Sequence, residues 1–328
     1  MSNMHVKAIN GQLPKEQEGM RATPGGKWRR DLNKNKFLLM LTLPMVIFVL
    51  VFSYLPMFGV IVAFKRYQFN KGILGSDWVG WDNFRFLVNS PDLWRIVRNT
   101  LGYNSLFIIL NLVVSVGVAM LLYEIVSRRL LKVYQTIMFF PHFLSWVVVA
   151  YMVYAFLNPR SGILNSLLEQ MGLSGMDWYN KPTAWLAVFP LANLWKEIGM
   201  SSIIYYAGLM GIDPAYYEAA RIDGASKWQI VTKISLPFLY PVMTILTILA
   251  IGHIFSADFG LFYQLPMNSP TLYATTDVID TYIFRALMEL GNIGMSSAAG
   301  LTKSVLGFVL VLSANAIVRR IDPDNSLF

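Results

Sequence analysis

The chain contains no cysteine, and this absence removes several classes of function at once. Disulfide scaffolds, thiolate zinc sites, iron–sulfur clusters and cysteine nucleophiles are all excluded. Charge is also scarce: Asp, Glu, Lys and Arg make up 14% of the residues, where an ordinary soluble domain has about 25%. The three histidines are scattered along the chain, so no metal site is expected. Hydrophobic residues make up 55% of the chain and the mean hydropathy is +0.48, which indicates a membrane protein.

Six stretches are apolar enough and long enough to cross a bilayer, which takes roughly 20 helical residues. Four of them contain no Asp, Glu, Lys or Arg. The other two contain charge, Lys196 with Glu197 in one and Lys303 in the other. We therefore predict an all-α polytopic membrane protein whose spans lie at about 37–64, 101–123, 133–157, 183–210, 239–257 and 295–318.

The distribution of basic residues predicts the orientation of these spans. A polar, basic tail of 36 residues precedes the first span and is too long for the start of a signal peptide. We expect it to be cytoplasmic and mobile. The segments that are then inside contain more Lys and Arg than those outside, as the positive-inside rule requires. The six-helix membrane domain would cover residues 37–320, with a second cytoplasmic tail at 321–328.

Two segments predicted to be outside the membrane contain distinctive patterns. Between residues 65 and 100, aromatic side chains alternate with charged ones, which fits either an aromatic belt at the headgroups or a sugar-stacking surface. We favour the belt. Between Asp277 and Leu290, apolar residues recur at helical spacing, which predicts a short amphipathic helix with Asp277 as N-cap and Gly291 as its stop.

The loop between the fourth and fifth spans, residues 211–237, has the signals of two short helices. Asp213 and Pro214 are a helix start, and Gly224 is a helix stop. Ser226 and Gln229 have the spacing of a capping box, which predicts a second helix to about Ser235. Such a protrusion is either a docking element for another protein or a hairpin lying on the membrane surface.

The residues of this loop also resemble a known motif. Glu218-Ala219-Ala220, then Gly224, then Ile234-Ser235-Leu236-Pro237, is similar to the EAA loop of permease subunits of ATP-binding-cassette (ABC) importers. The similarity extends to other segments and covers most of residues 34–320, among them 54–59, 141–146 and 195–206. The chain resembles the complex-carbohydrate permeases related to maltose-type importers, in the branch with lipoprotein-associated and alginate or pectin-oligosaccharide permeases.

This resemblance implies a fold, a function and partners. The fold would be the six-helix type I importer (MetI-like) permease fold, and the function would be import of an oligosaccharide. The expected partners are a second permease, usually a different one, although a homodimer stays open, together with two copies of an ABC ATPase and an extracellular solute-binding lipoprotein. Coupling to the ATPase would fall to Glu218, Ala219, Ala220, Arg221, Asp223 and Gly224.

The chain itself shows no sign of ATP chemistry. Gly25-Gly26-Lys27 is followed by Trp28, and no glycine at position 21 opens a phosphate-binding loop. We expect that the chain is not an enzyme, that it has no cofactor, and that ATP and Mg²⁺ bind the partner ATPase. A nucleic-acid partner is not expected, because eight of the 27 Lys and Arg residues precede the first span, as in a cytoplasmic lead-in to a membrane protein.

Polar residues within or beside the spans are candidates for the substrate pathway, because sugars bind through hydrogen bonds to hydroxyls and through aromatic stacking. Such residues can equally satisfy buried polar groups of a helical bundle. For the charged pair in the fourth span, one side chain could face the pathway and the other a partner helix, or both could form an interhelical salt bridge. Lys303 is expected to reach the outer interface. The candidates are Asn193, Trp195, Lys196, Glu197, Tyr205, His253 and Asp258.

Two alternative functions are a membrane-bound transferase and an ion-coupled transporter. A polytopic glycosyl or lipid transferase would need an acidic cluster, and the one Asp-x-Asp is Asp322-Pro323-Asp324 in the terminal tail. An ion-coupled secondary transporter would have no reason to carry an EAA loop.

Overall fold

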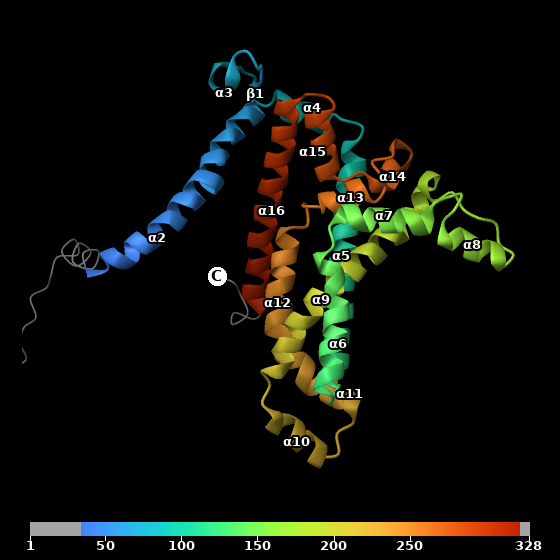
Figure 1. The fold of residues 1–328 in the computed structure, drawn as a ribbon. Coiled ribbons are helices and arrows are strands. Elements are labelled where there is room, and N and C mark those ends of the chain that lie inside the picture. The colour runs from blue at the N-terminus through green and yellow to red at the C-terminus, as the bar shows by residue number, and fades with distance from the viewer. Residues whose placement is uncertain (1–33, 322–328) are drawn as a thin grey trace, which may run out of the picture. The chain divides into compact units, whose positions relative to one another are not determined.

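The computed structural model describes residues 34–321, and nearly all of its regular structure is helical (Figure 1). Most of the predicted basic tail, and all but the first residue of the tail at 321–328, lie outside the described residues. The chain divides into two units, residues 1–59 and 60–328. Each unit is described by itself.

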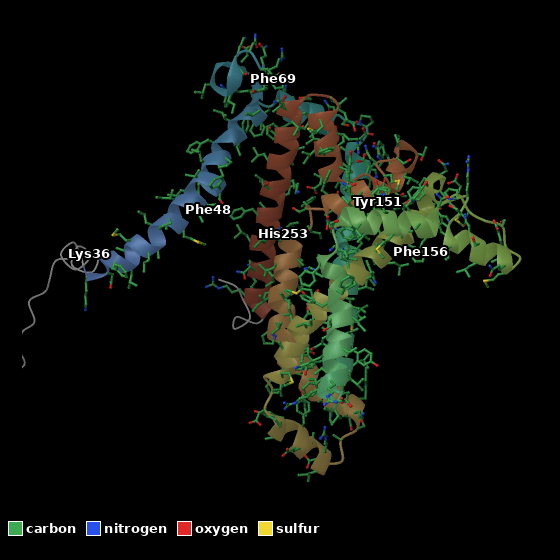
Figure 2. All side chains as sticks on the ribbon, viewed as in Figure 1. Lys36, Phe48, Phe69, Tyr151, Phe156 and His253 are labelled. Atoms are coloured by element: carbon green, nitrogen blue, oxygen red, sulfur yellow. The ribbon has the colours of Figure 1, made fainter. Side chains whose placement is uncertain are left out.

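The first unit contains a long apolar helix. It begins with α2 (Lys36–Val49), continues through a π-turn η1 (Leu50–Tyr54), and becomes the 3₁₀ segment η2 (Leu55–Phe64), which runs into the second unit. The π-turn immediately precedes Pro56, which has no N–H to donate to the helical ladder, so a change of hydrogen-bond register is expected there. Large side chains such as Phe48 are exposed along this helix (Figure 2).

The second unit begins with a small folded segment. Strand β1 (Lys65–Arg66) pairs antiparallel with β2 (Asp77–Trp78), and between them lies α3 (Gly72–Gly75). The buried Lys65 donates through Nζ to the carbonyls of Ile73 (2.9 Å) and Leu74 (2.8 Å), at the end of α3. Helix α4 (Asp82–Val88) follows. Trp78 and Trp81 pack against Phe64 yet stay more than half exposed, as an aromatic belt would require.

Long helices build the rest of the second unit (Figure 1). Helix α9 (Trp185–Met210) packs against α5 (Leu93–Tyr123), α6 (Arg128–Phe139) and α12 (Leu236–Gly252), and α16 (Ile293–Ile321) packs against α12. Large side chains of this unit such as Tyr151 also remain exposed (Figure 2). Shorter elements connect the helices: α8 (Ile163–Gln170), η4 (Trp178–Asn180), η5 (Pro182–Ala184), α13 (Phe259–Gln264), η7 (Pro270–Leu272), α14 (Tyr273–Thr276) and α15 (Ile279–Met288).

Within residues 34–321, four helices are long and apolar enough to cross a membrane: Lys36–Phe64, Leu93–Tyr123, Lys227–Gly252 and Ile293–Arg320. The second of them starts eight residues before the predicted position. Helix α9 has the length of a span, but its charged pair, Lys196 and Glu197, lowers its hydropathy. Six spans therefore stay a prediction.

The prediction that the third span is one helix over 133–157 is wrong. Helix α6 and the 3₁₀ turn η3 (Phe140–Phe143) end at an elbow, and α7 (Trp146–Leu157) departs at 99°. Pro141 cannot continue the helical ladder, and Leu144 and Ser145 take extended conformations. The Ser145 hydroxyl then accepts a hydrogen bond from the Val148 N–H (3.4 Å) and starts the new helix. We call residues 140–146 the elbow.

The second short helix predicted in the loop 211–237 is not separate. The capping box of Ser226 and Gln229 is present, but α11 (Lys227–Ile230), the π-turn η6 (Val231–Ser235) and α12 form one helix from Lys227 to Gly252. The predicted second helix ended at about Ser235, two residues before Pro237. The wider π-turn just before the proline lets the helix continue despite the missing N–H.

Asp277 is not the N-cap of the following helix, which was also a wrong prediction. The cap position is Val278, and α15 begins at Ile279. The fully buried Asp277 carboxylate instead accepts hydrogen bonds from Arg95 (2.8 Å) and Arg285 (2.6 Å). Gly291 follows the helix with φ +62°, as a stop residue should.

Candidate translocation cavity and coupling loop

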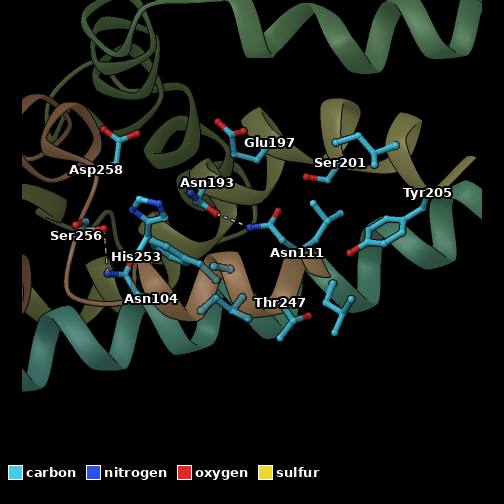
Figure 3. Close-up of a pocket in the computed structure, with 16 residues that line it drawn as sticks. Asn104, Asn111, Asn193, Glu197, Ser201, Tyr205, Thr247, His253, Ser256 and Asp258 are labelled. Carbon is cyan, nitrogen blue, oxygen red and sulfur yellow. Dashed lines mark hydrogen bonds between the residues drawn. The ribbon is translucent and has the colours of Figure 1, made fainter. Parts of the chain in front are cut away.

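A cavity of about 380 Å³ lies between α5, α9 and α12, and it is lined mainly from the faces that these helices turn toward one another (Figure 3). Much of its lining is polar, which is unusual inside a bundle of apolar helices. Besides Tyr205, the polar residues of the lining are Asn104, Asn111, Asn193, Glu197, Ser201, Thr247, His253, Ser256 and Asp258.

Helical spacing explains why these residues meet. Asn193, Glu197, Ser201 and Tyr205 follow one another at four-residue intervals on α9, so they form one stripe. From α5, Asn111 donates through Nδ2 to the Asn193 carbonyl oxygen Oδ1 (2.9 Å). Its own Oδ1 is buried and has no hydrogen-bond partner within the described part of the chain. This oxygen is an acceptor available at the cavity.

Lys196 does not line the cavity, although its neighbour Glu197 does. Its side chain is buried, and Nζ donates to the carbonyls of His142 (2.7 Å) and Leu144 (2.8 Å) in the elbow. The ammonium also lies 5.3 Å from the centre of the Trp146 ring. The carbonyls that the break leaves without N–H partners are therefore satisfied by a cation, which also suits the negative end of the α6 dipole.

Both carboxylates of the cavity also contact the elbow. Glu197 Oε2 lies 3.2 Å from His142 Nδ1. Asp258 accepts a hydrogen bond from the Trp146 indole N–H (2.6 Å) and caps α13 by accepting from the Leu261 N–H (3.2 Å). The elbow therefore fixes the positions of the charged groups that face the cavity.

Five of the seven predicted pathway residues line this cavity: Asn193, Glu197, Tyr205, His253 and Asp258. Trp195 instead borders a separate apolar cavity between α7 and α9, and Lys196 holds the elbow. Whether any of them contacts cargo stays a prediction. Sequence reasoning missed five polar lining residues, namely Asn104, Asn111, Ser201, Thr247 and Ser256.

Lys303 was expected to reach the outer interface, and this was wrong. Its ammonium pairs with Asp280 of α15. Asp280 also accepts a hydrogen bond from the Ala257 N–H (2.7 Å), so the pair ties α16 and α15 to the chain leaving α12. Among the residues 34–321 no cluster of three His, Asp or Glu side chains could hold a metal ion.

The loop after α9 forms a short helix, α10 (Pro214–Ile222), at one end of the helical bundle (Figure 1). Asp213 begins it by accepting a hydrogen bond from the Ala215 N–H (2.9 Å). After the helix, Gly224 takes φ +74°, a conformation that residues with a Cβ rarely adopt. Both ends of α10 are thus as the sequence predicted.

One aromatic side chain of α10 is buried. The Tyr217 ring lies 5.5 Å from that of Tyr123 at the end of α5, and its hydroxyl is 3.2 Å from the Ser235 hydroxyl in η6. It belongs to an apolar cluster that also contains Leu209 of α9 and Leu239 of α12. Helix α10 is therefore attached to the same three helices that line the cavity.

The opposite face of α10 and the following turn are exposed. Small residues leave this surface flat, and Ile222 stands out from it with 87% of its area accessible. A partner's backbone could approach such a surface closely. Of the six residues predicted for coupling, Glu218, Ala219, Arg221, Asp223 and Gly224 are exposed and Ala220 is half-buried.

Residues 111–323 match the family described as the binding-protein-dependent transport system inner membrane component. The chain belongs to this family. It is therefore a multi-pass permease subunit of the inner membrane, and such subunits are not themselves enzymes. The predicted resemblance and the MetI-like permease fold are confirmed, and this membership leaves no support for the transferase or the ion-coupled transporter.

Individual relatives agree with the family. The chain is 32% identical over 320 residues to the protein LplB of Bacillus subtilis (strain 168), covering 95% of this chain and 98% of LplB. It is 34% identical over 289 residues to YteP of the same organism, a polygalacturonan/rhamnogalacturonan transport system permease protein, covering 88% and 89%. A solved bacterial ABC transporter that imports the acidic polysaccharide alginate includes a chain with TM-score 0.83 and 35% identity, over 90% of this chain and 99% of that chain.

Proposed function

We propose that this permease moves an oligosaccharide into the cell, that a separate ATPase drives it, and that the loop 211–237 transmits the work. The cavity provides amide, hydroxyl and carboxylate groups, which are the partners that sugar hydroxyls need. Relatives support the cargo class, because YteP is named for pectic polysaccharides and the related transporter structure for alginate.

The attachment of α10 carries the coupling part of the proposal. Tyr217 is packed into the cluster that joins α5, α9 and α12, so a force applied to α10 acts on all the helices around the cavity. The exposed face of α10, from Glu218 to Gly224, would bind the ATPase, on which ATP and Mg²⁺ are bound. With α10 on the cytoplasmic side, both chain termini are cytoplasmic as well.

A related structure supports the remaining partners. A second structure of the alginate transporter is in complex with a periplasmic protein that holds an alginate pentasaccharide, with TM-score 0.81 and 36% identity. We infer that an extracellular binding lipoprotein delivers the sugar to this permease as well. A second, different permease subunit would complete the pathway, and two ATPase copies would bind the two permeases.

The test changes the turn and leaves the helix intact. In Gly224→Val, a β-branched residue must adopt φ +74°, whereas Asn tolerates that conformation, so Gly224→Asn is the matched control. No neighbouring atom would touch the new Cβ, so the effect is not one of internal crowding. We expect Gly224→Val to assemble with the ATPase but to lose sugar uptake, while Gly224→Asn keeps most of it. Normal uptake by Gly224→Val would count against the docking role.

A further inference from the structure

We infer that the cargo of this permease is an uncharged oligosaccharide, unlike the polyuronates named for its relatives; the inference rests on the proposed function. The observation is the charge of the cavity. Its lining contains two carboxylates, Glu197 and Asp258, and none of its 16 residues is Lys or Arg. The lysine that precedes Glu197 in the sequence has its charge directed elsewhere.

That lysine is Lys196, next to Glu197 in the sequence. Its Nζ lies 2.7 and 2.8 Å from the carbonyls of His142 and Leu144, inside the elbow. Adjacent residues of a helix point about 100° apart, so Lys196 cannot also turn toward the cavity that Glu197 faces. The cation therefore stabilises backbone carbonyls and offers nothing to an anionic cargo.

A polyuronate would meet two costs in this cavity. Each sugar carboxylate would lose its water without gaining a cation, and it would approach Glu197 and Asp258, which carry the same charge. Recognition of carboxylates in proteins normally relies on Arg or Lys, with the guanidinium giving bidentate pairs. The lining of this cavity has neither.

A neutral sugar fits the same groups. Its hydroxyls can donate to the carboxylates, which accept only, and can accept from amide and hydroxyl donors such as Asn193 and Ser201. The carboxylates keep free lone pairs for this purpose, since a carboxylate has about four acceptor sites. One carboxylate has His142 beside it, and the other accepts from Trp146 and the Leu261 N–H. A cationic amino sugar would have to share the carboxylate oxygens with these existing partners, whereas a hydroxyl can use a remaining lone pair.

The first arm of the test measures the electrostatic potential of the cavity and uses the fact that the chain has no cysteine. Ser201→Cys places one thiol four residues from Glu197 on α9, and Ser161→Cys places one at an exposed position for comparison. In the assembled importer, each thiol is reacted with a cationic and an anionic methanethiosulfonate of similar size. We expect the ratio of the cationic to the anionic reaction rate to be at least about tenfold higher at Ser201→Cys than at Ser161→Cys. A single negative charge roughly 6 Å from the thiol gives a difference of this size even in a water-like dielectric.

Substitution then assigns the effect. Glu197→Gln in the Ser201→Cys background should lower the ratio toward that of Ser161→Cys, whereas Glu169→Gln, at an exposed position on α8, should leave it unchanged. Equal ratios at the two thiols, or a faster anionic reagent in the cavity, would overturn the inference.

The second arm identifies the cargo. Vesicles containing the complete importer, with its binding lipoprotein, are offered a mixed digest of neutral, uronate-containing and amino-sugar-containing polysaccharides, and the imported molecules are identified by mass spectrometry. We expect only uncharged oligosaccharides inside. Import of uronate or amino-sugar oligomers at a comparable rate would overturn the inference. Import of no sugar at all would refute the proposed function itself, while the thiol ratio would still report the charge of the cavity, so the two failures differ.

Discussion

Lys196 should be essential to the stability of the elbow, and replacing it with Met isolates that role. Methionine keeps the length and most of the volume of the side chain but removes the ammonium, which donates to two carbonyls at 2.7 and 2.8 Å. Each hydrogen bond from a charged donor contributes about 1.5–3 kcal/mol, so the gross loss is about 3–6 kcal/mol. Part of this loss is recovered, because the variant no longer has to remove an ammonium from water. That desolvation costs several kcal/mol per ion.

We therefore expect a net destabilisation of about 2–3 kcal/mol, since two buried carbonyls remain without donors. An unfolding entropy of about 2.1 cal/mol/K per residue gives about 0.7 kcal/mol/K for 328 residues, so each kcal/mol shifts the melting temperature by about 1.5 °C. The predicted fall is therefore about 3–4 °C. Thermal unfolding of the detergent-solubilised permease would measure it, with Lys181→Met, at an exposed position, as the control. Uptake should fall as well, because the elbow also contacts Glu197 and Asp258.

A shift of under about 1 °C in Lys196→Met, equal to that of Lys181→Met, would refute this reasoning, because 1 °C corresponds to only about 0.7 kcal/mol in a chain of 328 residues. It would mean that the elbow carbonyls find other donors, such as water, once the ammonium is gone. A large loss of stability with unchanged uptake in the folded fraction would refute only the second part, the link between the elbow and the carboxylates of the cavity.

Two further substitutions test packing away from the cavity. Asp277→Asn removes the buried charge between two arginines and should cost about 3–5 kcal/mol, whereas Asp92→Asn, at a partly exposed ion pair, should cost under about 1 kcal/mol; chemical denaturation of both variants measures the difference. Gly199→Ala would push a methyl group into the Met138 carbonyl where α9 crosses α6 and should cost about 1–3 kcal/mol, while Gly117→Ala, with open space around it, should be neutral in the same melting assay. Equal effects within either pair would contradict the packing described here.

The sequence identified the family, the helical class and the ends of α10 because each leaves a local signal. Asp213 with Pro214, Gly224 with its left-handed conformation, and the capping box that opens the next helix all act within one turn of the residues that encode them. Local signals of this kind survive whatever the tertiary packing turns out to be.

Three of the wrong predictions involve a partner distant in the sequence. Pro141 marks a possible break, but the sharp elbow is stabilised by an ammonium on another helix, more than fifty residues later. Asp277 looks like a cap until Arg95, from the start of α5, is brought beside it. Lys303 looks free to reach the interface until Asp280 meets it. Hydropathy and spacing along one helix cannot identify such partners.

The cavity itself had a signal in the sequence that was not used. Helix α9 is mostly apolar, but it has a polar residue at every fourth position: Asn193, Glu197 and Ser201. This spacing places the three on one face of the helix. On α5, Asn104 and Asn111 are seven residues apart and share a face in the same way. Since polar groups in a span are costly unless they face protein or water, two such stripes predict that the helices turn them toward one another. Periodicity of the polar residues, rather than of the apolar ones, is therefore the feature that locates this cavity.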